Sequence, residues 1–269
     1  MNLLRLKLNA VAEILRHFQN PLLVLLMRLG LLKVPLFLYR IAKGPLHYAM
    51  LARPTSNSMA DLFVLREVFV QETYQDILPL IEKKPIRIVD VGGNIGSFTV
   101  WLSRNRSLES GYCFEPDPTS FSLCRYNLSG NGCAFVDVIP KAVGGKSRRI
   151  SMRVNTNRPG GNTIYAGPRG TRADGEEAVV EVIAFGEWLR TLQGDFDVLK
   201  LDCEGAEWEI VDETPNDAWQ RFALIVAEIH EEPNCRHTPD DFPKLMEARG
   251  FETTRWDGGH MGLYIGRRR

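Results

Sequence analysis

The chain has 269 residues, with 33 Lys or Arg against 33 Asp or Glu, 44% hydrophobic residues and 25% charged residues. This composition is typical of a folded globular protein and excludes wholesale disorder. The balanced charge argues against a chain-wide basic surface of the kind that binds nucleic acid backbones. The five cysteines form no C-x-x-C pair, which excludes zinc-finger and thioredoxin motifs, and their odd number favours a reducing compartment.

The zero net charge conceals an asymmetry between the start of the chain and the rest. Residues 1–53 hold eight Lys or Arg and a single acid, Glu13, so their net charge is +7. Residues 54–269 hold the other 25 basic and 32 acidic residues, a net charge of −7. The basic segment is also rich in leucine, but its longest uncharged stretch, residues 17–27, is too short to span a bilayer.

We expect residues 1–53 to form a basic, leucine-rich helical extension and residues 54–269 to form the main domain. Apolar residues recur at helical spacing over residues 4–18, and Asn20-Pro21 predicts a break followed by a second helix. Two interpretations stay open. The extension packs as a cap on the main domain, or residues 1–50 also contact a membrane or a partner. The expected location is cytoplasmic, at the inner membrane face if the extension docks there.

From residue 58 onward, apolar strands alternate with helices. The pattern predicts, in chain order, a helix over residues 58–74, a strand over 86–91, a helix over 95–104, a strand over 111–114, a helix over 119–127 and a strand over 135–139. Alternating strands and helices pair in parallel with helices on both faces of the sheet. We therefore expect an α/β fold.

Residues 148–183 interrupt this alternation. Strands are expected over residues 150–154 and 179–183, on either side of a loop at residues 155–175 that is rich in Gly, Asn and Arg. The alternation then resumes with a helix over 185–192, a strand over 196–201, a helix over 206–211, a strand over 224–229, a helix over 239–249 and closing strands over 252–255 and 261–265.

The segment Asp90-Val91-Gly92-Gly93-Asn94-Ile95-Gly96 follows the first strand of the alternation and resembles a ligand-binding turn. Glycines let the backbone turn sharply and approach a ligand, and the following helix offers free N–H groups. The dinucleotide fingerprint is absent, because position 94 is Asn and position 97 is Ser. A phosphate-binding loop is also excluded, because no Gly-Lys-Ser/Thr follows.

Two acids indicate which ligand this turn binds. A carboxylate in the turn, Asp90, repels a pyrophosphate and favours a sulfonium group. Glu115, at the end of the second strand, can accept two hydrogen bonds from a ribose diol. Together they indicate S-adenosylmethionine (SAM) rather than NAD or ATP.

Three segments carry a resemblance to a known family: residues 89–99, residues 114–118 and the run Leu199-Lys200-Leu201-Asp202-Cys203-Glu204-Gly205-Ala206-Glu207. They resemble the FkbM family of SAM-dependent methyltransferases. The pattern Arg53…Asp61…Tyr74 and the run Ala227-Glu228-Ile229-His230 are similar to that family too. The resemblance covers about residues 50–267. It implies a class I methyltransferase (Rossmann-like) fold, with a seven-stranded, mostly parallel sheet, helices on both faces and one antiparallel strand near the edge.

The resemblance also implies a role for each matching position of the cofactor site. The expected contacts are, for the methionine part of SAM, Asp90, Gly92, Asn94 and Gly96; for the ribose, Glu115; for the adenosine, Asp117 and Phe121; and for the adenine, Lys141 and Ala142. Tyr74 either reaches the methionine carboxylate from the preceding helix or is a core tyrosine.

Catalysis is expected at the ends of the later strands, where Asp202, Glu228 and His230 share one rim. Asp202 is expected beside the methyl group, where it contacts cofactor and acceptor, binds a cation or caps the next helix. His230 can be a general base, a metal ligand or a hydrogen-bonded rim histidine. A divalent cation on Asp202, Glu228 and His230 is an open alternative. Glu204 either binds substrate or is favoured by the helix dipole.

The loop at residues 155–175 is expected to be a substrate lid, with a solvated hairpin tip as the alternative. Its Arg158, Asn162 and Arg169 suit hydroxyl-rich or anionic acceptors such as sugars and their phosphates.

We therefore expect a SAM-dependent methyltransferase that methylates a hydroxyl on a sugar, glycan or natural-product acceptor, since members of the resembled family are associated with such O-methylation. The alternatives are N-methylation, transfer of another SAM-derived group, and a membrane-docked SAM-binding scaffold without turnover. A nucleic acid partner is not expected, because there is no Asn/Asp-Pro-Pro-Tyr/Phe motif for gripping a flipped base and residues 54–269 are acidic.

Overall fold

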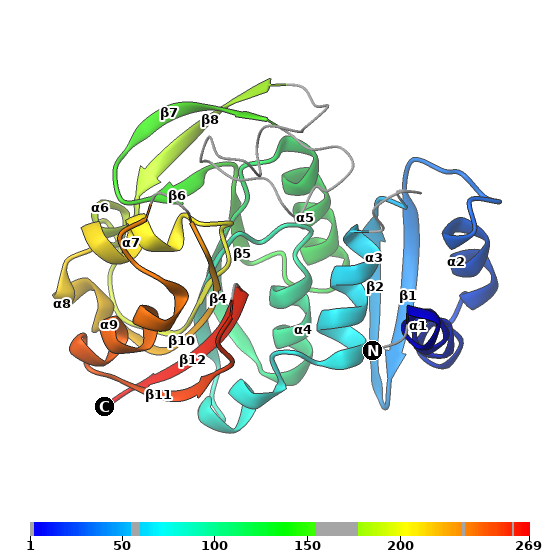
Figure 1. The fold of residues 1–269 in the computed structure, drawn as a ribbon, viewed down its shortest axis with the longest axis horizontal. Coiled ribbons are helices and arrows are strands. Elements are labelled where there is room, and N and C mark those ends of the chain that lie inside the picture. Colours follow the sequence, from blue (N-terminus) through cyan, green and yellow to red (C-terminus); the bar gives the residue numbers. More distant parts are fainter. Residues whose placement is uncertain (1–2, 55–59, 154–176, 233–234, 260) are drawn as a thin grey trace.

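A seven-stranded sheet forms the centre of the molecule (Figure 1). The computed structural model describes residues 3–54, 60–153, 177–232, 235–259 and 261–269. The strand order is β11-β12-β10-β9-β3-β4-β5, and β12 runs antiparallel to both of its neighbours while the other pairs are parallel. The strands are β3 (Ile86–Val91), β4 (Leu108–Phe114), β5 (Val136–Ile139), β9 (Phe196–Leu201), β10 (Phe222–His230), β11 (Phe251–Trp256) and β12 (Met261–Arg268). The predicted fold class is confirmed.

Side chains alternate between the two faces of the sheet, and each face has its own core. Along β3, Ile86 and Ile88 join one cluster of buried apolar residues, whereas Val89 and Val91 join the other. The helices that cover the sheet are α4 (Ser97–Asn105), α5 (Pro118–Gly130), α6 (Phe185–Arg190), α7 (Glu207–Glu213), α8 (Asn216–Trp219) and α9 (Phe242–Ala248), the last preceded by a short 3₁₀ turn η4 (Pro239–Asp241).

The strand order reverses between β3 and β9, which defines the switch point of the sheet. From β3 the chain moves outward to β4 and β5, and it later returns to the other side of β3 as β9 and β10. In open α/β sheets ligands bind beyond the carboxyl ends of the strands at such a point. A small second sheet has the order β6-β8-β7 and consists of β6 (Ala142–Gly144), β7 (Arg148–Arg153) and β8 (Glu177–Ala184).

The first 53 residues are only partly helical. Helices α1 (Leu3–His17) and α2 (Pro21–Arg28) lie where they were expected, but β1 (Phe37–Lys43) and β2 (Leu46–Ala52) form an antiparallel hairpin. The expectation of a wholly helical extension is therefore wrong for these strands. Tyr39 and Ile41 are buried on either side of the exposed Arg40, which is the period-2 pattern of a strand. None of the described helices is long and apolar enough to cross a membrane.

The hairpin packs against α5 through two asparagine side chains, which form hydrogen bonds with the backbone of β2 as a neighbouring strand would. Asn127 accepts a hydrogen bond from the Leu51 N–H (2.7 Å), and its amide nitrogen donates to the Leu51 carbonyl (2.9 Å) and to the Ile95 carbonyl (2.8 Å). Asn131, one turn later, pairs with Ala49 in the same way. These bonds satisfy backbone groups on the edge of β2 and tie the extension to the loop after β3.

The link from β2 to the main domain is held by a buried ion pair. Arg53 donates from Nε and Nη2 to the two Asp61 oxygens, each at 3.0 Å, and from Nη2 to Ser120 Oγ at 3.1 Å. Asp61 lies in the first turn of α3 (Ala60–Leu65), which continues into a π-helical turn η1 (Arg66–Gln71) and, after a break, a 3₁₀ helix η2 (Gln75–Leu80). The helix expected over residues 58–74 is thus replaced by these shorter elements in the part that the structure describes.

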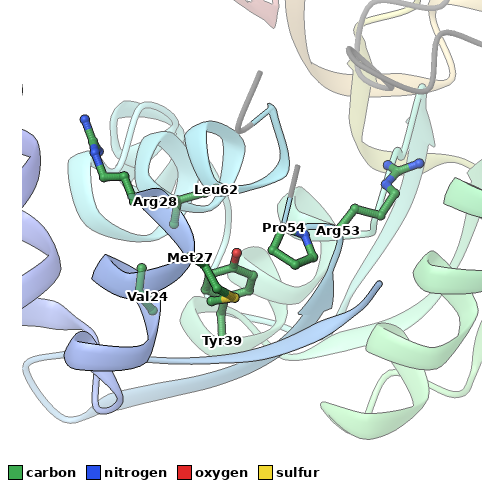
Figure 2. A pocket seen from close by; sticks show the side chains of 7 residues that line it. All are labelled: Val24, Met27, Arg28, Tyr39, Arg53, Pro54 and Leu62. Atoms are coloured by element: carbon green, nitrogen blue, oxygen red, sulfur yellow. The ribbon is translucent and has the colours of Figure 1, made fainter. Parts of the chain in front are cut away.

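Figure 2 shows the pocket at this junction, between α2, the hairpin and α3. Its lining is mostly apolar and consists of Val24, Met27, Arg28, Tyr39, Arg53, Pro54 and Leu62. The buried side chains of the extension belong to the same apolar cluster as those of α4, since Ile14 and Phe18 share it with Phe98 and Trp101.

We predict that Asn127→Ala lowers the free energy of unfolding by about 2–3 kcal/mol, because it removes three hydrogen bonds and leaves half-buried backbone groups of β2 without a partner. Urea denaturation of the full chain measures this value. Ser122→Ala, on the exposed side of the same helix, is the matched control and should change it by less than about 0.5 kcal/mol. Equal effects of the two substitutions would contradict the role given to Asn127.

Candidate active site

The turn after β3 lies directly against the end of β9. Gly92 has φ +79°, and a Cβ at this position would lie 1.7 Å from the Asp202 carbonyl oxygen, so only glycine fits. The Asp202 N–H donates to the Val91 carbonyl at 3.1 Å, which fixes the two loops together. The glycine turn and Asp202 are therefore brought to one place, as the resemblance implied.

A buried lysine, Lys200, lies between the acids of this site. Its ammonium group donates to the Gly92 carbonyl at 2.8 Å and lies 3.0 Å from Asp202 Oδ2 and 3.6 Å from Asp90 Oδ1. Burial disfavours its charge, but Asp202, Asp90 and Glu228 outweigh burial and raise the pKa of Lys200. Lys200 is thus a fixed positive charge under the glycine turn.

Lys200 is a buried partner of Asp90. Asp90 is fully buried, accepts a hydrogen bond from Thr99 Oγ1 at 2.8 Å and pairs in register with Lys200 across β3 and β9. Its carboxylate is therefore paired with a buried cation, although its Oδ1 accepts no hydrogen bond from the described residues. A contact of Asp90 with the methionine part of SAM stays a prediction that no distance here supports.

Glu115 is positioned by two backbone groups. Its oxygens accept hydrogen bonds from the N–H groups of Asn94 and Asp117, each at 2.8 Å. Burial raises the pKa of Glu115 to about 7, with repulsion from Asp117 adding to it, although the two N–H groups act in the opposite direction. Each carboxylate oxygen keeps a second lone pair, so the group can still accept hydrogen bonds from a diol.

The remaining cofactor residues differ in how well their positions suit a ligand. Asn94 has φ +49°, and its Oδ1 is buried without a hydrogen-bond partner among the described residues. Asp117, in contrast, is the N-cap of α5, accepting from the Ser120 N–H at 2.6 Å and facing Arg53 at 3.8 Å. Its carboxylate is directed into the fold, so the expectation that it flanks the adenosine is not supported.

Four further residues were expected to contact the cofactor: Gly96, Phe121, Lys141 and Ala142. Gly96 has φ +83° and precedes α4. Phe121 lies in the first turn of α5 and has the Arg125 guanidinium 5.6 Å from its ring centre. Lys141 and Ala142 connect β5 to β6, and the Lys141 ammonium pairs with Glu181 at 3.1 Å. Their contacts with the adenosine and adenine stay predictions.

Tyr74 and Glu228 form a second polar pair. The Tyr74 hydroxyl donates to Glu228 Oε1, and the Tyr74 ring packs edge-on against Phe98 with 5.0 Å between ring centres. Tyr74 is thus a core residue whose polar tip is committed to Glu228, which disfavours its expected contact with the methionine carboxylate. Burial, with repulsion from Asp202, raises the pKa of Glu228 to about 8.

Glu67 is a site residue that sequence reasoning missed. It lies in the π-helical turn η1, and burial followed by repulsion from Asp202 raises its pKa. Single π-helical turns are frequent at functional sites, but no feature of a single sequence reveals one. Lys200 was missed for a related reason, although a lysine within the mostly apolar strand 196–201 is a signal that could have found it.

His230 is held by two glutamates from the start of α7. Its Nδ1 lies 3.3 Å from Glu207 Oε1 and its Nε2 lies 3.8 Å from Glu204 Oε2. Glu207 is fully buried and also accepts from the N–H groups of Cys203 and Gly205, so it organises the whole turn. Glu204 has φ +56°, an uncommon conformation for a residue with a side chain.

The contacts of His230 agree with one of the three roles expected for it, that of a hydrogen-bonded histidine at the rim. Burial disfavours the imidazolium, but Glu207, Glu204 and Asp202 outweigh burial and raise the pKa of His230 to about 10. The raised pKa favours the imidazolium, which donates hydrogen bonds, over the neutral ring that a general base requires. The structure groups Asp202, Glu204 and His230, with one ligand atom of each within 4.8 Å of the others, and Glu228 is not in this set.

The three substrate residues proposed for the lid, Arg158, Asn162 and Arg169, lie outside the described residues.

Comparison with known proteins identifies the family. Residues 90–253, more than half of the chain, match the methyltransferase FkbM domain. The chain belongs to the FkbM family of SAM-dependent methyltransferases, and the predicted family is confirmed. The match begins at Asp90, near the end of β3, and includes the glycine turn. It also includes Glu115, Lys200, Asp202, Glu204, Glu207, Glu228 and His230, whereas Glu67 and Tyr74 precede it.

Two similar proteins carry methyltransferase names. Methyltransferase 1 of Beauveria bassiana (strain ARSEF 2860) is 24% identical over 238 residues, covering 81% of this chain and 93% of that protein. Methyltransferase sdnD of Sordaria araneosa is 26% identical over 220 residues, covering 72% of this chain and 83% of that protein. Among solved structures, precorrin-6y C5,15-methyltransferase from Geobacter metallireducens GS-15 is 13% identical, with a TM-score of 0.44 and coverage of 74% and 89%.

We predict that the stability of the protein falls as the pH rises from about 6.5 to about 10, in part through His230. Its pKa is higher in the folded chain than in the unfolded chain, so its stabilising contribution is complete below about pH 6.5 and is lost as the pH rises through about 10. In His230→Asn this part of the pH dependence, about 3–5 kcal/mol, should disappear.

Chemical denaturation at pH 6, 8 and 10 measures this dependence, and His47→Asn, at an exposed position, is the control. If wild type and His230→Asn lose stability in parallel over this range, His230 is not held as a cation.

Proposed function

We propose that this methyltransferase transfers the methyl group of SAM to a hydroxyl oxygen of a neutral, hydroxyl-rich acceptor: a sugar, a glycan or a natural product. The observation that carries the proposal is the position of Asp202. Its backbone adjoins the glycine turn, and its carboxylate, 26% exposed, lies beside Lys200 and near Glu228. An acceptor at this place would meet carboxylate oxygens, which accept hydrogen bonds from hydroxyl groups and repel phosphates.

The residues of the turn fit SAM. Asn94 Oδ1, buried and unpartnered, offers an acceptor for the ammonium of the methionine part, and Glu115 offers lone pairs for the ribose diol. Gly92 and Gly96, at positive φ, let the backbone approach the ligand. When bound, SAM supplies an electrophilic methyl carbon and a neutral thioether leaving group.

The side chains at the rim would then align and deprotonate the acceptor. Holding two reactants in the reactive geometry can supply roughly 7–11 kcal/mol of the barrier. Asp202 would position the hydroxyl, and Glu228, when ionised, would take its proton, adding a factor on the order of 100 to 10,000. His230, as a donor, would hold Glu204 and Glu207 in place, and Glu228 would serve as the base.

Methyl transfer from labelled SAM to a panel of glycosides, nucleotide sugars and lipid-linked sugars tests the proposal. We expect label in a product whose mass and alkali stability identify a methyl ether, and we expect activity to survive exhaustive EDTA treatment. Label in an N-methyl product would overturn the O-methyl assignment. SAM binding without transfer to any acceptor of the panel would favour the scaffold alternative.

We predict that the transfer rate rises with pH and levels off above about pH 8, because Glu228 acts as a base only when it is ionised. Glu228→Gln should lose the rising limb and fall in kcat by a factor on the order of 100 or more. Glu252→Gln, exposed on β11, is the control and should keep the wild-type profile. An unchanged pH profile in Glu228→Gln would rule out this residue as the base.

A further inference from the structure

Two helices of the extension expose leucines to solvent at the outer end of the molecule, on the right of Figure 1. We call this surface the leucine face. Its members are 43–73% exposed, and the set consists of Leu8, Leu15, Leu22, Leu23, Leu29, Leu31 and Leu36. Scattered apolar side chains are normal on a protein surface, but seven leucines within 29 residues are not scattered.

Helix α2 is apolar on both of its sides. Val24 and Met27 are buried and line the pocket of Figure 2, together with Arg28. Leu22 and Leu29 are seven residues apart, so they share one stripe on the side opposite Val24. A helix that is apolar all round is normally buried, and the structure covers only one side of this one.

Helix α1 repeats the arrangement. Ile14 and Phe18 are buried against the hairpin and the main domain, and they hold the helix in place. Leu8 and Leu15, again seven residues apart, are about 60% exposed on a side of the helix next to the buried one. Because both helices keep their buried contacts with the fold, the exposed leucines are presented by a docked element rather than by a loose tail.

The positive charge of residues 1–53 favours an anionic partner for the leucine face. Residues 1–53 hold eight basic residues, and their one acid, Glu13, is paired with Arg66 at 2.8 Å. Arg16, Lys33 and Arg40 are exposed within the same segment. The net charge of +7 would make a second copy of this surface repel the first, whereas an anionic lipid surface attracts it by about 1 kcal/mol for each basic residue near the headgroups.

The lengths of the helices favour lying on a bilayer. At 15 and 8 residues, α1 and α2 are shorter than the roughly 20 residues that cross the hydrocarbon core. Basic helices with an exposed apolar stripe bury that stripe at the boundary between headgroups and acyl chains.

We propose that the leucine face is a docking surface for anionic lipid bilayers. The exposed leucines of α1, of α2 and of residues 29–36 enter the interface, and Arg16, Lys33 and Arg40 contact lipid phosphates. The inference does not depend on the acceptor of the methyl group, since it rests on the extension alone.

Cosedimentation of the full chain with vesicles tests this. We expect binding to vesicles that contain about 30% phosphatidylserine, a loss of most binding in about 0.5 M salt, and little binding to pure phosphatidylcholine. The triple variant Leu22→Ser, Leu29→Ser and Leu31→Ser should bind the anionic vesicles at least about tenfold more weakly. Val179→Ser, which alters an exposed apolar residue on β8, is the matched control and should bind like wild type.

Circular dichroism and SAM titration confirm that each variant is folded, since the substituted side chains lie outside the core. Equal binding of wild type and the triple variant would overturn the proposal, as would failure of the wild type to bind anionic vesicles. Light scattering tests whether a second copy of this chain binds the leucine face instead of a bilayer. If the wild type forms a dimer that the triple variant does not form, and does not bind vesicles, the leucine face is a contact between copies of this chain.

Discussion

The carboxyl ends of β3 and β9 bring Asp90, Asp202 and the Gly92 carbonyl oxygen together in the interior, and such an arrangement requires a counter-charge. Lys200 supplies it, with all three groups within 3.6 Å of its ammonium nitrogen. The geometry of the glycine turn and the orientation of Asp202 both depend on this one interaction. An isolated buried carboxylate would protonate or distort the turn instead. The site is thus a set of acids balanced by Lys200 and His230, rather than two bare acids facing a cationic ligand.

The rest of the molecule supports that balance from both sides. On one side the glutamates of α7 keep His230 charged. On the other, η1 and η2 bring Glu67 and Tyr74 over the same strand ends. The extension reaches this region through α5, because Asn127 bonds both to β2 and to Ile95 in the glycine turn. Changes in the extension therefore reach the cofactor turn through a short chain of hydrogen bonds.

The sequence predicted most of the central sheet, because strands such as 196–201 are mostly apolar and lie between clear turn signals. The same reasoning predicted that Asp202 and the glycine turn lie at the same edge of the sheet. It missed the hairpin over 37–52, since a leucine-rich segment also suits a helix, and it missed Lys200, whose role appears only when β3 and β9 are in register. The charge of His230 depends on Glu207, 23 residues away in the chain. Roles that rest on contacts between distant elements are not readable from spacing.

A double-mutant cycle between Lys200 and Asp90 tests the counter-charge most directly. Unfolding free energies of the wild type, Lys200→Met, Asp90→Asn and the double variant give the coupling between the two groups. We expect Lys200→Met alone to lose about 3–5 kcal/mol, and the double variant to recover about 2–3 kcal/mol of this loss, because the buried carboxylate is then no longer charged. Losses that add within about 0.5 kcal/mol would contradict a stabilising role of Lys200 as the counter-charge.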